Sequence, residues 1–337
     1  MRLSDLDYTL PAELIAQTPI EPRDAARLMV VGRAAGTIFH RHFRDLPELL
    51  MPGDLIVAND SRVMTARLRA TKATGGTLEV LLLREVDGGD WEALIRGRVR
   101  EGTRLEFTSE NGPPDEAVVV STEPSGLRRL RFERSAREVM RAHGEAPIPP
   151  YVLQPPAEPE RYQTVYSRLA GSAAAPTAGL HFTLDLIDRL RSRGVGLAFV
   201  TLHVGVDTFR PVTEEDVSTH PIHAEWFHIP AATRKAVRDT RAAGRRVVAI
   251  GTTSVRTLEA AGADAAGPED GWTDLFIMPG HRFRCVDAMI TNFHLPRTTL
   301  LALVAAFAGL DLTHRAYRTA IDERYRFYSF GDAMLIE

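Results

Sequence analysis

Three histidines stand in short segments where a catalytic acid or base could work. His181 lies in LHFT, His203 lies at the end of the apolar run LAFVTLHV, and His294 lies in NFHLP. The pKa of an imidazole lies near neutrality, so each ring could accept or donate a proton during a reaction. A structural histidine with satisfied hydrogen bonds is the alternative for each one taken singly. Three of them in loops at one edge of a sheet favour a catalytic role.

A run of hydroxyl side chains opens the segment GTTSVR. The preceding VVAI is apolar throughout, which is typical of a strand buried on both faces. Gly251 permits a tight turn, and Thr252, Thr253 and Ser254 then stand beside the free N–H groups of a helix start. Such a turn can hold a carboxylate or the hydroxyls of a ligand, and plain N-capping is the alternative. Arg256 could pair with an anionic ligand group or line a solvated helix face.

The segment AAPTAGLHFT, residues 174–183, brings Pro176 and Gly179 close together. Neither a helix nor a strand accommodates both, so we expect a loop. Thr177 supplies a hydroxyl and Phe182 an aromatic face.

Metal chemistry is not favoured by the histidine-rich stretch HPIHAEWFH, residues 220–228, which also holds Glu225. It contains no HExxH motif, and no cysteine stands beside it, so its spacing is not diagnostic of a metal site. The chain also lacks a P-loop, a dinucleotide-binding glycine fingerprint, the glycine-rich loop of methyltransferases and a G-x-S-x-G nucleophile elbow. We expect no metal.

The elements that must position these residues alternate from about residue 160 onwards. Strand signals such as VGLAFVTLHV, RRVVAIG, WTDLFIMPG and VDAMITNF are interspersed with helix signals such as TLDLIDRLRSRG, which Thr183 can cap, and TLLALVAAFAG. This alternation predicts an α/β domain with a largely parallel sheet. We assign residues 1–60 and 150–337 to that domain.

Residues 61–149 have a different texture. Short β-rich runs such as TLEVLLLREV, WEALIRGRV and EAVVVST are separated by glycine and proline turns. This pattern is typical of an all-β barrel or sandwich, here inserted into the α/β domain.

Ligands of α/β sheets bind beyond the carboxyl ends of the strands. Four polar loops are expected at that edge: APTAGLHF, LHVGVDTF with Asp207, IGTTSVR, and TNFHLP with Asn292 and Phe293. We therefore expect them to surround one site.

Composition limits the possible classes of protein. The chain has 337 residues, a net charge of −3 and one cysteine, Cys285, so no internal disulfide is possible and a reducing cytoplasm is expected. The longest apolar stretch, residues 298–310, is too short to span a bilayer. The stretch 128–141 holds six arginines and two glutamates; it could contact phosphates or form a solvated face.

Taken together, the segments resemble the family of S-adenosylmethionine:tRNA ribosyltransferase-isomerases of queuosine biosynthesis. The resemblance runs almost end to end and rests on segments such as LIAQTPIEPRDAARLMV, PGDLIVANDSRVMTARL, GSAAAPTAGLHFT, TLHVGVDTFRPV, AIGTTSVRTLEA, DAMITNFHLPRTTLLALVAAFAG and YRFYSFGDAMLI. Many long motifs in one order are specific, although no single one would be. The resemblance implies an α/β domain with an inserted β-barrel.

The reaction that the resemblance implies takes place on tRNA bearing 7-aminomethyl-7-deazaguanine at the wobble position. The ribosyl part of S-adenosylmethionine moves onto the aminomethyl nitrogen and isomerises to an epoxycyclopentanediol, so the product is epoxyqueuosine, and adenine and methionine leave. S-adenosylmethionine is consumed as a substrate, and no cofactor is implied. We expect a cytoplasmic monomer that does not engage a membrane.

For this chemistry we expect His181 and His203 to act as acid and base, with His294 third and Asp207 and Glu225 as carboxylate alternatives. The sulfonium acidifies the ribose 5′-carbon, so a base must remove a proton there, and an acid should help adenine to leave.

The binding contacts follow the same logic. The GTTS turn should face the methionine carboxylate or the ribose hydroxyls, because a helix N-terminus is partly positive. Phe182 or Phe293 suits the sulfonium through a cation–π contact. Arg62 and Arg67, with the insert, should contact the RNA, and the wobble base should be splayed from its loop.

Two other classes of function remain as alternatives. A methyltransferase acting on RNA would release S-adenosylhomocysteine, and a non-catalytic RNA-binding protein would leave the RNA unchanged.

Overall fold

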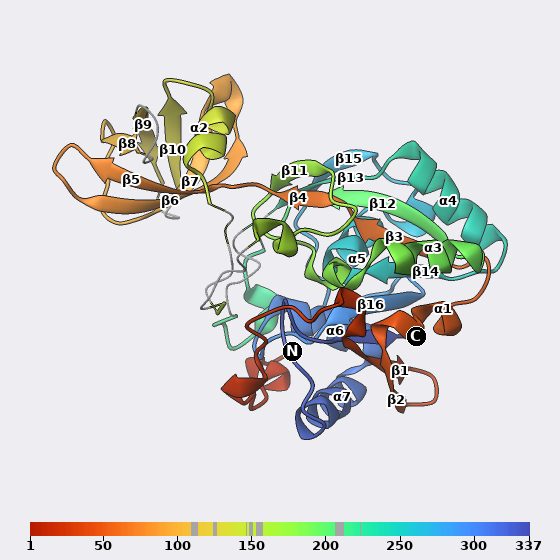
Figure 1. Ribbon diagram of the computed structural model, residues 1–337. Coiled ribbons are helices and arrows are strands. Elements are labelled where there is room, and N and C mark those ends of the chain that lie inside the picture. The colour runs from red at the N-terminus through yellow and green to blue at the C-terminus, as the bar shows by residue number, and fades with distance from the viewer. Residues whose placement is uncertain are drawn as a thin grey trace. The chain divides into compact units, whose positions relative to one another are not determined.

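The computed structural model describes residues 1–108, 114–123, 127–145, 147, 151–152, 158–205, 212–222 and 224–337. The chain forms two compact units. Unit 1 comprises residues 1–62, 149–169 and 175–337, and unit 2 comprises residues 63–148 and 170–174. Both ends of the chain belong to unit 1 (Figure 1).

Unit 1 is built on a nine-stranded sheet. In spatial order its strands are β15 (Asp270–Thr273), β13 (Glu225–His228), β12 (Gly196–Leu202), β3 (Leu55–Asn59), β14 (Val247–Ile250), β16 (Ala288–Asn292), β17 (Ala333–Ile336), β1 (Arg27–Gly32) and β2 (Thr37–His42). A separate two-stranded sheet pairs β4 (Ser61–Val63) with β11 (Leu169–Ser172).

The predicted parallel sheet is confirmed at its centre. Strands β12, β3, β14 and β16 run parallel to one another, and they are joined by helices, as parallel strands require. The flanks differ from the prediction, because β13 and β15 on one side and β17 against β16 on the other pair antiparallel. The sheet as a whole is therefore mixed rather than largely parallel. An antiparallel flanking pair needs no crossover helix, so the alternation of strand and helix signals did not reveal it.

Helices cover both faces of this sheet. They are α1 (Leu46–Leu49), α3 (Leu184–Ser192), α4 (Ala231–Ala242), α5 (Gly251–Ala260), α6 (Thr299–Ala308) and α7 (Leu310–Asp322). On one face, α3 packs its Leu186, Ile187 and Leu190 into the main core, and on the other α5 contacts all four central strands. The predicted cap is confirmed, since Thr183 Oγ1 accepts the N–H of Leu186 at 3.1 Å.

Short 3-10 helices complete unit 1. They are η1 (Leu3–Leu6), η2 (Ala12–Leu14), η3 (Arg23–Ala25), η4 (Phe43–Asp45), η6 (Pro159–Tyr162), η7 (Thr177–His181), η9 (Val217–Thr219) and η10 (Ala263–Ala265). The segment predicted as a loop at 174–183 therefore contains a helical turn, η7, which begins directly after Pro176. A proline directly before the turn breaks no helical hydrogen bond.

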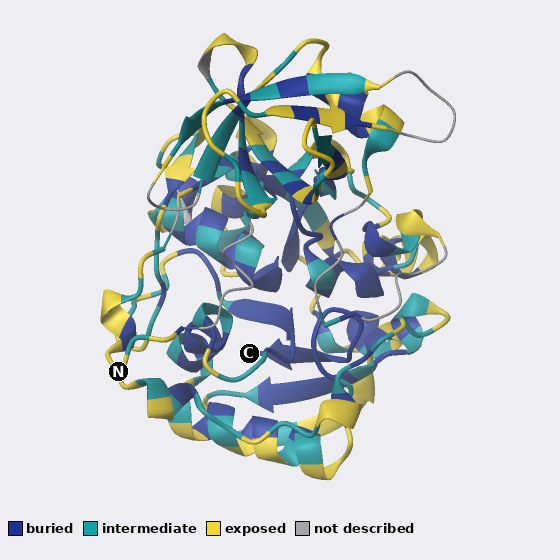
Figure 2. Ribbon diagram, turned by 90° about the vertical axis from the view of Figure 1, so that its left-hand side faces the viewer, coloured by how far each residue is buried: buried dark blue, intermediate teal, exposed yellow. Residues whose placement is uncertain are grey.

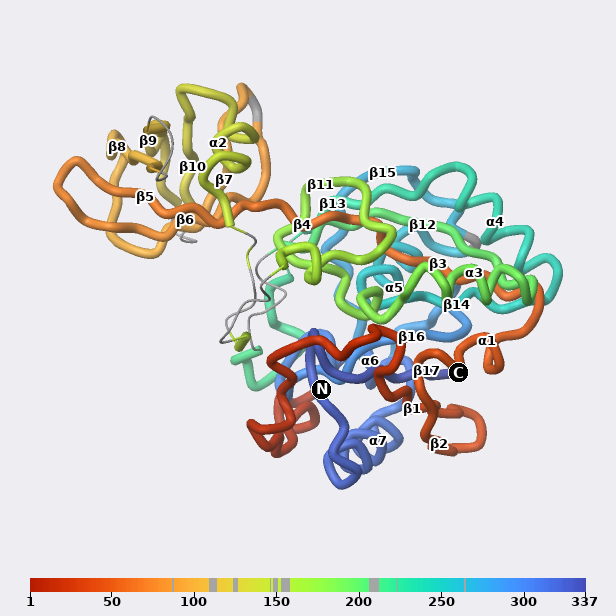
Figure 3. Tube along the Cα trace, in the orientation of Figure 1, coloured from red at the N-terminus to blue at the C-terminus, as the bar shows by residue number. Residues whose placement is uncertain are grey.

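The N-terminal and C-terminal segments of unit 1 lie side by side (Figure 3). Phe327 N donates to Leu14 O at 2.7 Å, and Ala16 N donates to Phe327 O at 3.1 Å. The hydroxyl of Tyr8 donates to the carbonyl of His294. The first residues of the chain thus help to hold the loop that follows β16.

One predicted strand is shorter than expected. The run WTDLFIMPG forms a strand only as far as Thr273. Thr273 pairs with Glu225, which is the first residue of β13, so β13 offers no strand residue with which the run could pair beyond that point. Beyond it, the carbonyl of Leu275 accepts a hydrogen bond from Arg256 Nε at 3.1 Å. The apolar side chains of this run line a cavity instead of a sheet face.

Unit 2 is a closed six-stranded antiparallel barrel, which confirms the predicted β-barrel. Its strands, in spatial order, are β10 (Leu127–Phe132), β7 (Trp91–Arg96), β6 (Thr77–Glu85), β5 (Arg67–Lys72), β8 (Arg104–Phe107) and β9 (Asp115–Thr122), with η5 (Asp87–Gly89) and α2 (Ala136–His143) beside them. Alternate residues, among them Leu68, Val80 and Leu82, fill its interior.

Burial follows the expected pattern (Figure 2). The central strands of unit 1 are buried throughout, as in β3 and β14, and exposed residues gather in turns and outer helix faces. In the described part of the chain, no single helix is long and apolar enough to cross a membrane. Only α6 and α7 taken together meet that test, and they are bent by 114° at the break. Most of α6 is buried within unit 1.

Candidate functional site

The candidate site lies along the carboxyl edge of the four parallel strands of unit 1. The chain leaves this edge after Leu202 of β12, Asn59 of β3, Ile250 of β14 and Asn292 of β16. Each of the four strands is followed by polar residues. An α/β sheet typically places its ligands there, because the strand ends and helix starts leave the polar groups uncovered.

Asn292 and η7 form the first cluster. Thr177 Oγ1 donates to Asn292 Oδ1 at 3.0 Å, which orients the amide, and Asn292 Nδ2 then donates to Nε2 of His181 at 3.2 Å. The ring of His181 stacks on Phe43 with centroids 4.9 Å apart. Because Asn292 offers a donor, His181 Nε2 must be the unprotonated, accepting nitrogen.

Burial keeps this imidazole neutral. It lowers the pKa of His181 to about 4, an effect opposed by a hydrogen bond with the backbone of Arg23. His181 is only 5 % exposed. It is thus a fixed hydrogen-bond acceptor at neutral pH, and a substrate reaches its Nε2 only by replacing Asn292.

His294 lies in a different environment. Its Nε2 is 2.8 Å from Thr291 Oγ1, and its backbone N–H donates to the hydroxyl of Tyr317 at 3.0 Å. Burial lowers the pKa of His294 to about 3. Successive strand residues point to opposite faces, so Thr291 and Asn292 direct His294 and His181 to opposite sides of β16. The structure therefore does not bring these two histidines together.

His203 follows β12 directly and is half-buried. Its ring stacks on Trp226 of β13, with centroids 5.1 Å apart, and its backbone N–H donates to Trp226 O at 3.0 Å. Residues opposite each other in an antiparallel pair share a face, which places His203 with Thr201 on the face that α3 covers. It shares that face with His181 rather than with His294.

Asp60 is a site residue that the sequence reasoning missed. It follows β3 at the centre of the edge and is only 1 % exposed. Thr201 Oγ1 donates to its Oδ1 at 2.7 Å, and Arg168 donates to its Oδ2 at 2.7 Å. The available signal was a carboxylate in NDS directly after the buried strand LIVA, the same position that singled out the other loops.

Asn59 holds the two neighbouring strand ends together. Its Nδ2 donates to Leu202 O at 3.0 Å, and its Oδ1 accepts the N–H groups of Leu202 and Ser61 at 3.1 and 3.0 Å. This sets the positions of Asp60 and of the chain that leads to His203.

Two unsatisfied hydroxyls face the edge near η7. The Tyr166 hydroxyl is buried without a hydrogen-bond partner in the described part of the chain, and so is Thr253 Oγ1. A Cβ built on Gly179 would lie 2.1 Å from the Tyr166 oxygen, so only glycine permits this approach. Burial raises the pKa of the Tyr166 phenol, and the charge of Asp60 adds to the rise. A buried polar group without a partner costs about 1–3 kcal/mol, which a bound ligand or water would relieve.

The three hydroxyls of the GTTS turn differ. α5 begins at Gly251 itself, the residue expected to form the turn before the helix, and no side chain caps it, so the plain N-capping interpretation is wrong. Ser254 Oγ donates back to Ile250 O at 2.7 Å, and Thr252 is buried. Of the three, Thr253 is the one whose buried hydroxyl lacks a partner in the described residues.

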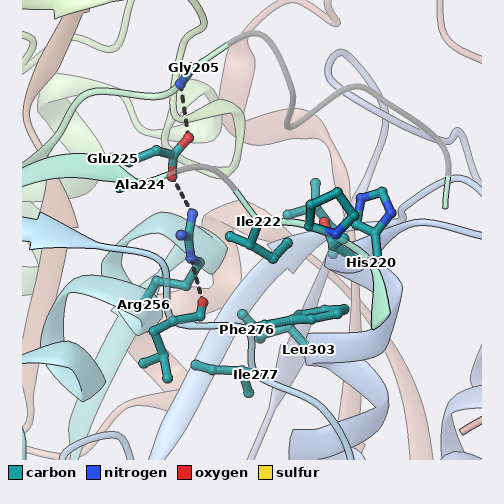
Figure 4. A pocket seen from close by; sticks show the side chains of 13 residues that line it. Gly205, His220, Ile222, Ala224, Glu225, Arg256, Phe276, Ile277 and Leu303 are labelled. Carbon is teal, nitrogen blue, oxygen red and sulfur yellow. Dashed lines mark hydrogen bonds and ion pairs between the residues drawn. The ribbon is translucent and has the colours of Figure 1, made fainter. Parts of the chain in front are cut away.

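A second cluster lies on the opposite face of the sheet, around Glu225 and Arg256 (Figure 4). The carboxylate of Glu225 pairs with the guanidinium of Arg256, and its Oε1 accepts the N–H of Gly205 at 2.8 Å. Arg256 also donates to the carbonyls of Leu275 and Thr273. The suggestion that Arg256 lines a solvated helix face is therefore wrong.

This pair borders a cavity of about 70 Å³. Ile222, Phe276 and Leu303 form its apolar wall, and His220, held at 2.6 Å by Glu214, lies at its rim (Figure 4). The arrangement offers both signs of charge beside an apolar hollow.

The remaining residues that were predicted to contact the substrate or the RNA are enclosed, already paired, or outside the described part of the chain. Phe182 and Phe293 are enclosed by other rings and are 1 % and 0 % exposed, so a cation reaches neither face without a rearrangement. Arg62 is already held by Glu160 at 2.6 Å, and Arg67 lies 3.6 Å from Glu79. Asp207 lies outside the described residues.

No metal centre is evident: in the described ranges, no group of three or more His, Cys, Asp or Glu side chains could hold a metal ion. The sole cysteine, Cys285, is buried and packed beside Glu259.

Fold and site together define an α/β enzyme whose polar cluster lies at the carboxyl edge of a parallel sheet core, with a closed β-barrel in a separate unit. The sequence profile of the family described as "Queuosine biosynthesis protein" matches residues 3–336, and the chain belongs to this family.

Relatives match over the full length of both chains. An S-adenosylmethionine:tRNA ribosyltransferase-isomerase of Symbiobacterium thermophilum is 54 % identical over 343 residues, and that of Moorella thermoacetica is 50 % identical over 344 residues. The crystal structure of S-adenosylmethionine tRNA ribosyltransferase from Thermotoga maritima is 42 % identical and covers 99 % of this chain and all of its own, with a TM-score of 0.58.

Proposed function

We propose that the chain transfers the ribosyl group of S-adenosylmethionine to 7-aminomethyl-7-deazaguanine at the wobble position of tRNA and isomerises it, releasing adenine and methionine. The observation that carries this proposal is the end-to-end similarity to relatives that bear the name of that enzyme. The methyltransferase and the non-catalytic alternatives are not favoured, because they have no such support. A cytoplasmic, monomeric enzyme without a metal or redox cofactor remains our expectation.

The cluster on the α3 face is proposed to work on the ribosyl group. His203 is half-buried and stacked on Trp226, so it can reach a ligand without unpacking the core. We assign it the proton transfer at the ribose 5′-carbon, whose acidity comes from the neighbouring sulfonium. Asp60, anchored by Thr201 and Arg168, supplies a fixed negative charge on the same side of the sheet.

The unpartnered hydroxyls of Tyr166 and Thr253 are proposed to bind the ribose hydroxyls. Each can donate or accept, as a sugar hydroxyl requires. Gly179 is proposed to let the backbone approach the sugar closely beside Tyr166. Asn292, oriented by Thr177, is proposed to give up its hydrogen bond to Nε2 of His181, so that the neutral ring accepts from the same ligand instead.

The Glu225–Arg256 cavity is proposed to receive the methionine end. A zwitterionic α-amino acid carries both charges, which match the guanidinium and the carboxylate there, and its methylene chain suits the apolar wall. Glu225 and Arg256 already pair with each other. The methionine end would therefore bind by replacing this pair, with its carboxylate on Arg256 and its ammonium group on Glu225.

The experiment is an assay for free adenine. Mixing the protein, S-adenosylmethionine and tRNA that carries the 7-aminomethyl-7-deazaguanine base should release adenine and methionine in equal amounts. S-adenosylhomocysteine as the product would support the methyltransferase instead, and unchanged RNA that stays tightly bound would support the non-catalytic alternative.

A further inference from the structure

Unit 2 carries a basic hollow that the sequence reasoning did not single out. Its volume is about 610 Å³, and it is lined by the β5–β6 turn at 72–74 and by the β7–β8 connection at 98–104. Both segments are loops closed by glycines with positive φ, Gly75 in one and Gly102 in the other. The barrel therefore presents these loops on a rigid support.

The side chains of the hollow are strongly cationic. Lys72, Arg98, Arg100 and Arg104 are its cations, and Glu101 is its only carboxylate among the described residues. Arg98 and Arg100 are exposed, and within the described part of the chain neither forms an ion pair. Arg104 lies 3.6 Å from Glu116 in a pair that is open to solvent, which contributes little.

The more conspicuous basic stretch at 128–141 is different. Its Arg131 pairs with Asp90 through two hydrogen bonds of 2.8 and 2.9 Å, Arg134 pairs with Asp115 at 2.6 Å, and Arg137 pairs with Glu85 at 3.2 Å. A paired arginine must give up its carboxylate before it can bind another anion, whereas an unpaired one only releases counterions. Three of the six arginines in this stretch are thus held by carboxylates, whereas Arg128, Arg129 and Arg141 form no ion pair within the described residues. The hollow differs in gathering its unpaired arginines with Lys72 and Arg104 around one concave surface.

We infer that the hollow formed by Lys72, Arg98, Arg100 and Arg104 is the docking surface for the phosphate backbone of the RNA substrate. This inference rests on the proposed function and names the part of unit 2 that binds the same tRNA. Phosphate contacts supply affinity and orientation without reading the sequence of the bases. Val99 is the one large apolar side chain in the lining, so the hollow suits a charged backbone better than an apolar protein or lipid surface.

The test compares wild-type protein with the double variant R98A/R100A. KM for the modified tRNA should rise roughly tenfold, while KM for S-adenosylmethionine stays unchanged, because the lost contacts bind only RNA. The slope of log K for tRNA against log salt concentration should become shallower by about 1.4, from two phosphate contacts at about 0.7 each. The conservative variant R98K/R100K should restore most of the slope, since lysine keeps the charge.

The control for net charge is R191A/R193A, which also removes the solvent-exposed pair of Arg191 with Asp188 at 3.5 Å. These two arginines are exposed at the C-terminal end of α3, next to the amino end of β12 and thus at the opposite end of that strand from the candidate site. Removing them changes the net charge equally, and KM and the salt slope should stay at wild-type values.

The outcomes separate the two proposals. If wild-type protein releases no adenine, the proposed function fails, whatever the variants do. If it does turn over but R98A/R100A keeps the wild-type KM for tRNA and the wild-type salt slope, the docking surface is refuted. It is refuted equally if R98A/R100A loses binding to phosphatidylserine vesicles while tRNA binding is unchanged. Wild-type melting temperatures would show that the variants fold.

Discussion

Asn292 at the end of β16 donates a hydrogen bond from its side-chain amide to Nε2 of His181 in η7, over 3.2 Å. Thr177 fixes the orientation of that amide from the other side. The network joins Asn292 to Thr177, 115 positions away along the chain, and to His181, 111 positions away. Burial lowers the pKa of the histidine and keeps it neutral, and Asn292 determines which ring nitrogen accepts.

The buried histidines should make stability depend on pH. The pKa of His181 is lowered to about 4 and that of His294 to about 3, both from 6.5. Below pH 6.5 the two histidines bind protons in the unfolded chain but stay neutral in the folded protein. The free energy of unfolding is therefore fully retained above pH 6.5 and falls as the pH drops towards 4. Each histidine should contribute a slope of up to about 1.4 kcal/mol per pH unit in that window.

Urea unfolding of wild type and His294→Gln between pH 4 and pH 7 measures this slope. The variant should lose about half of the dependence that the two histidines produce, because glutamine does not titrate. Identical slopes in the two proteins would show that His294 titrates in the folded protein as it does in the unfolded chain.

Replacing His203 with alanine should reduce kcat by about 10²–10⁴-fold if the ring transfers a proton. The matched control is His228→Ala, since His228 also stacks on Trp226, with centroids 6.2 Å apart, but lies further from the carboxyl edge. Both variants lose one stacking contact, worth about 0.5–1.5 kcal/mol, so their stabilities should fall alike. Equal activity of the two variants in the adenine-release assay would argue against a catalytic His203.

His181 responds differently from His203. It is buried and stacked on Phe43, so His181→Ala should destabilise the fold as well as slow turnover. We therefore expect His203→Ala to remain folded with a small loss of stability, and His181→Ala to lose considerably more.

Tyr166→Phe should separate binding from folding. The hydroxyl has no partner among the described residues, so its removal should leave the melting temperature unchanged or slightly raised, while KM for S-adenosylmethionine rises up to about tenfold through one lost hydrogen bond. Tyr325→Phe is the opposite control, because that hydroxyl bonds His40 at 2.7 Å away from the site. A wild-type KM for Tyr166→Phe would remove Tyr166 from the proposed ribose contacts.

Glu225→Gln should destabilise unit 1 by about 3–5 kcal/mol, because it leaves the charge of Arg256 buried without its counter-charge. The amide oxygen can still accept from Gly205, so the change isolates the charge. Asp239→Asn breaks the exposed pair with Lys235 and should change stability by less than about 1 kcal/mol. Chemical denaturation of both variants measures the difference, and similar small effects would mean that solvent screens the Glu225–Arg256 pair.

Several features of the fold could be predicted from local pattern. The apolar run VVAI indicated a strand buried on both faces, Thr183 capped α3 as expected, and the hydroxyl run after Gly251 lies in the first turn of α5. Short strands separated by turns indicated the barrel. These properties depend on residues close together in sequence, so the sequence specifies them directly.

The sequence by itself determined the family, the strand and helix core of unit 1 and the loops at its carboxyl edge. Only the tertiary structure decided which side chains in those loops are available for chemistry. Thr291 and Asn292 are neighbours in sequence, yet they direct His294 and His181 to opposite faces of the sheet, and Asp60 joined the site through Thr201, 141 positions away. Availability depends on burial and on partners contributed by distant segments, and no local pattern encodes those.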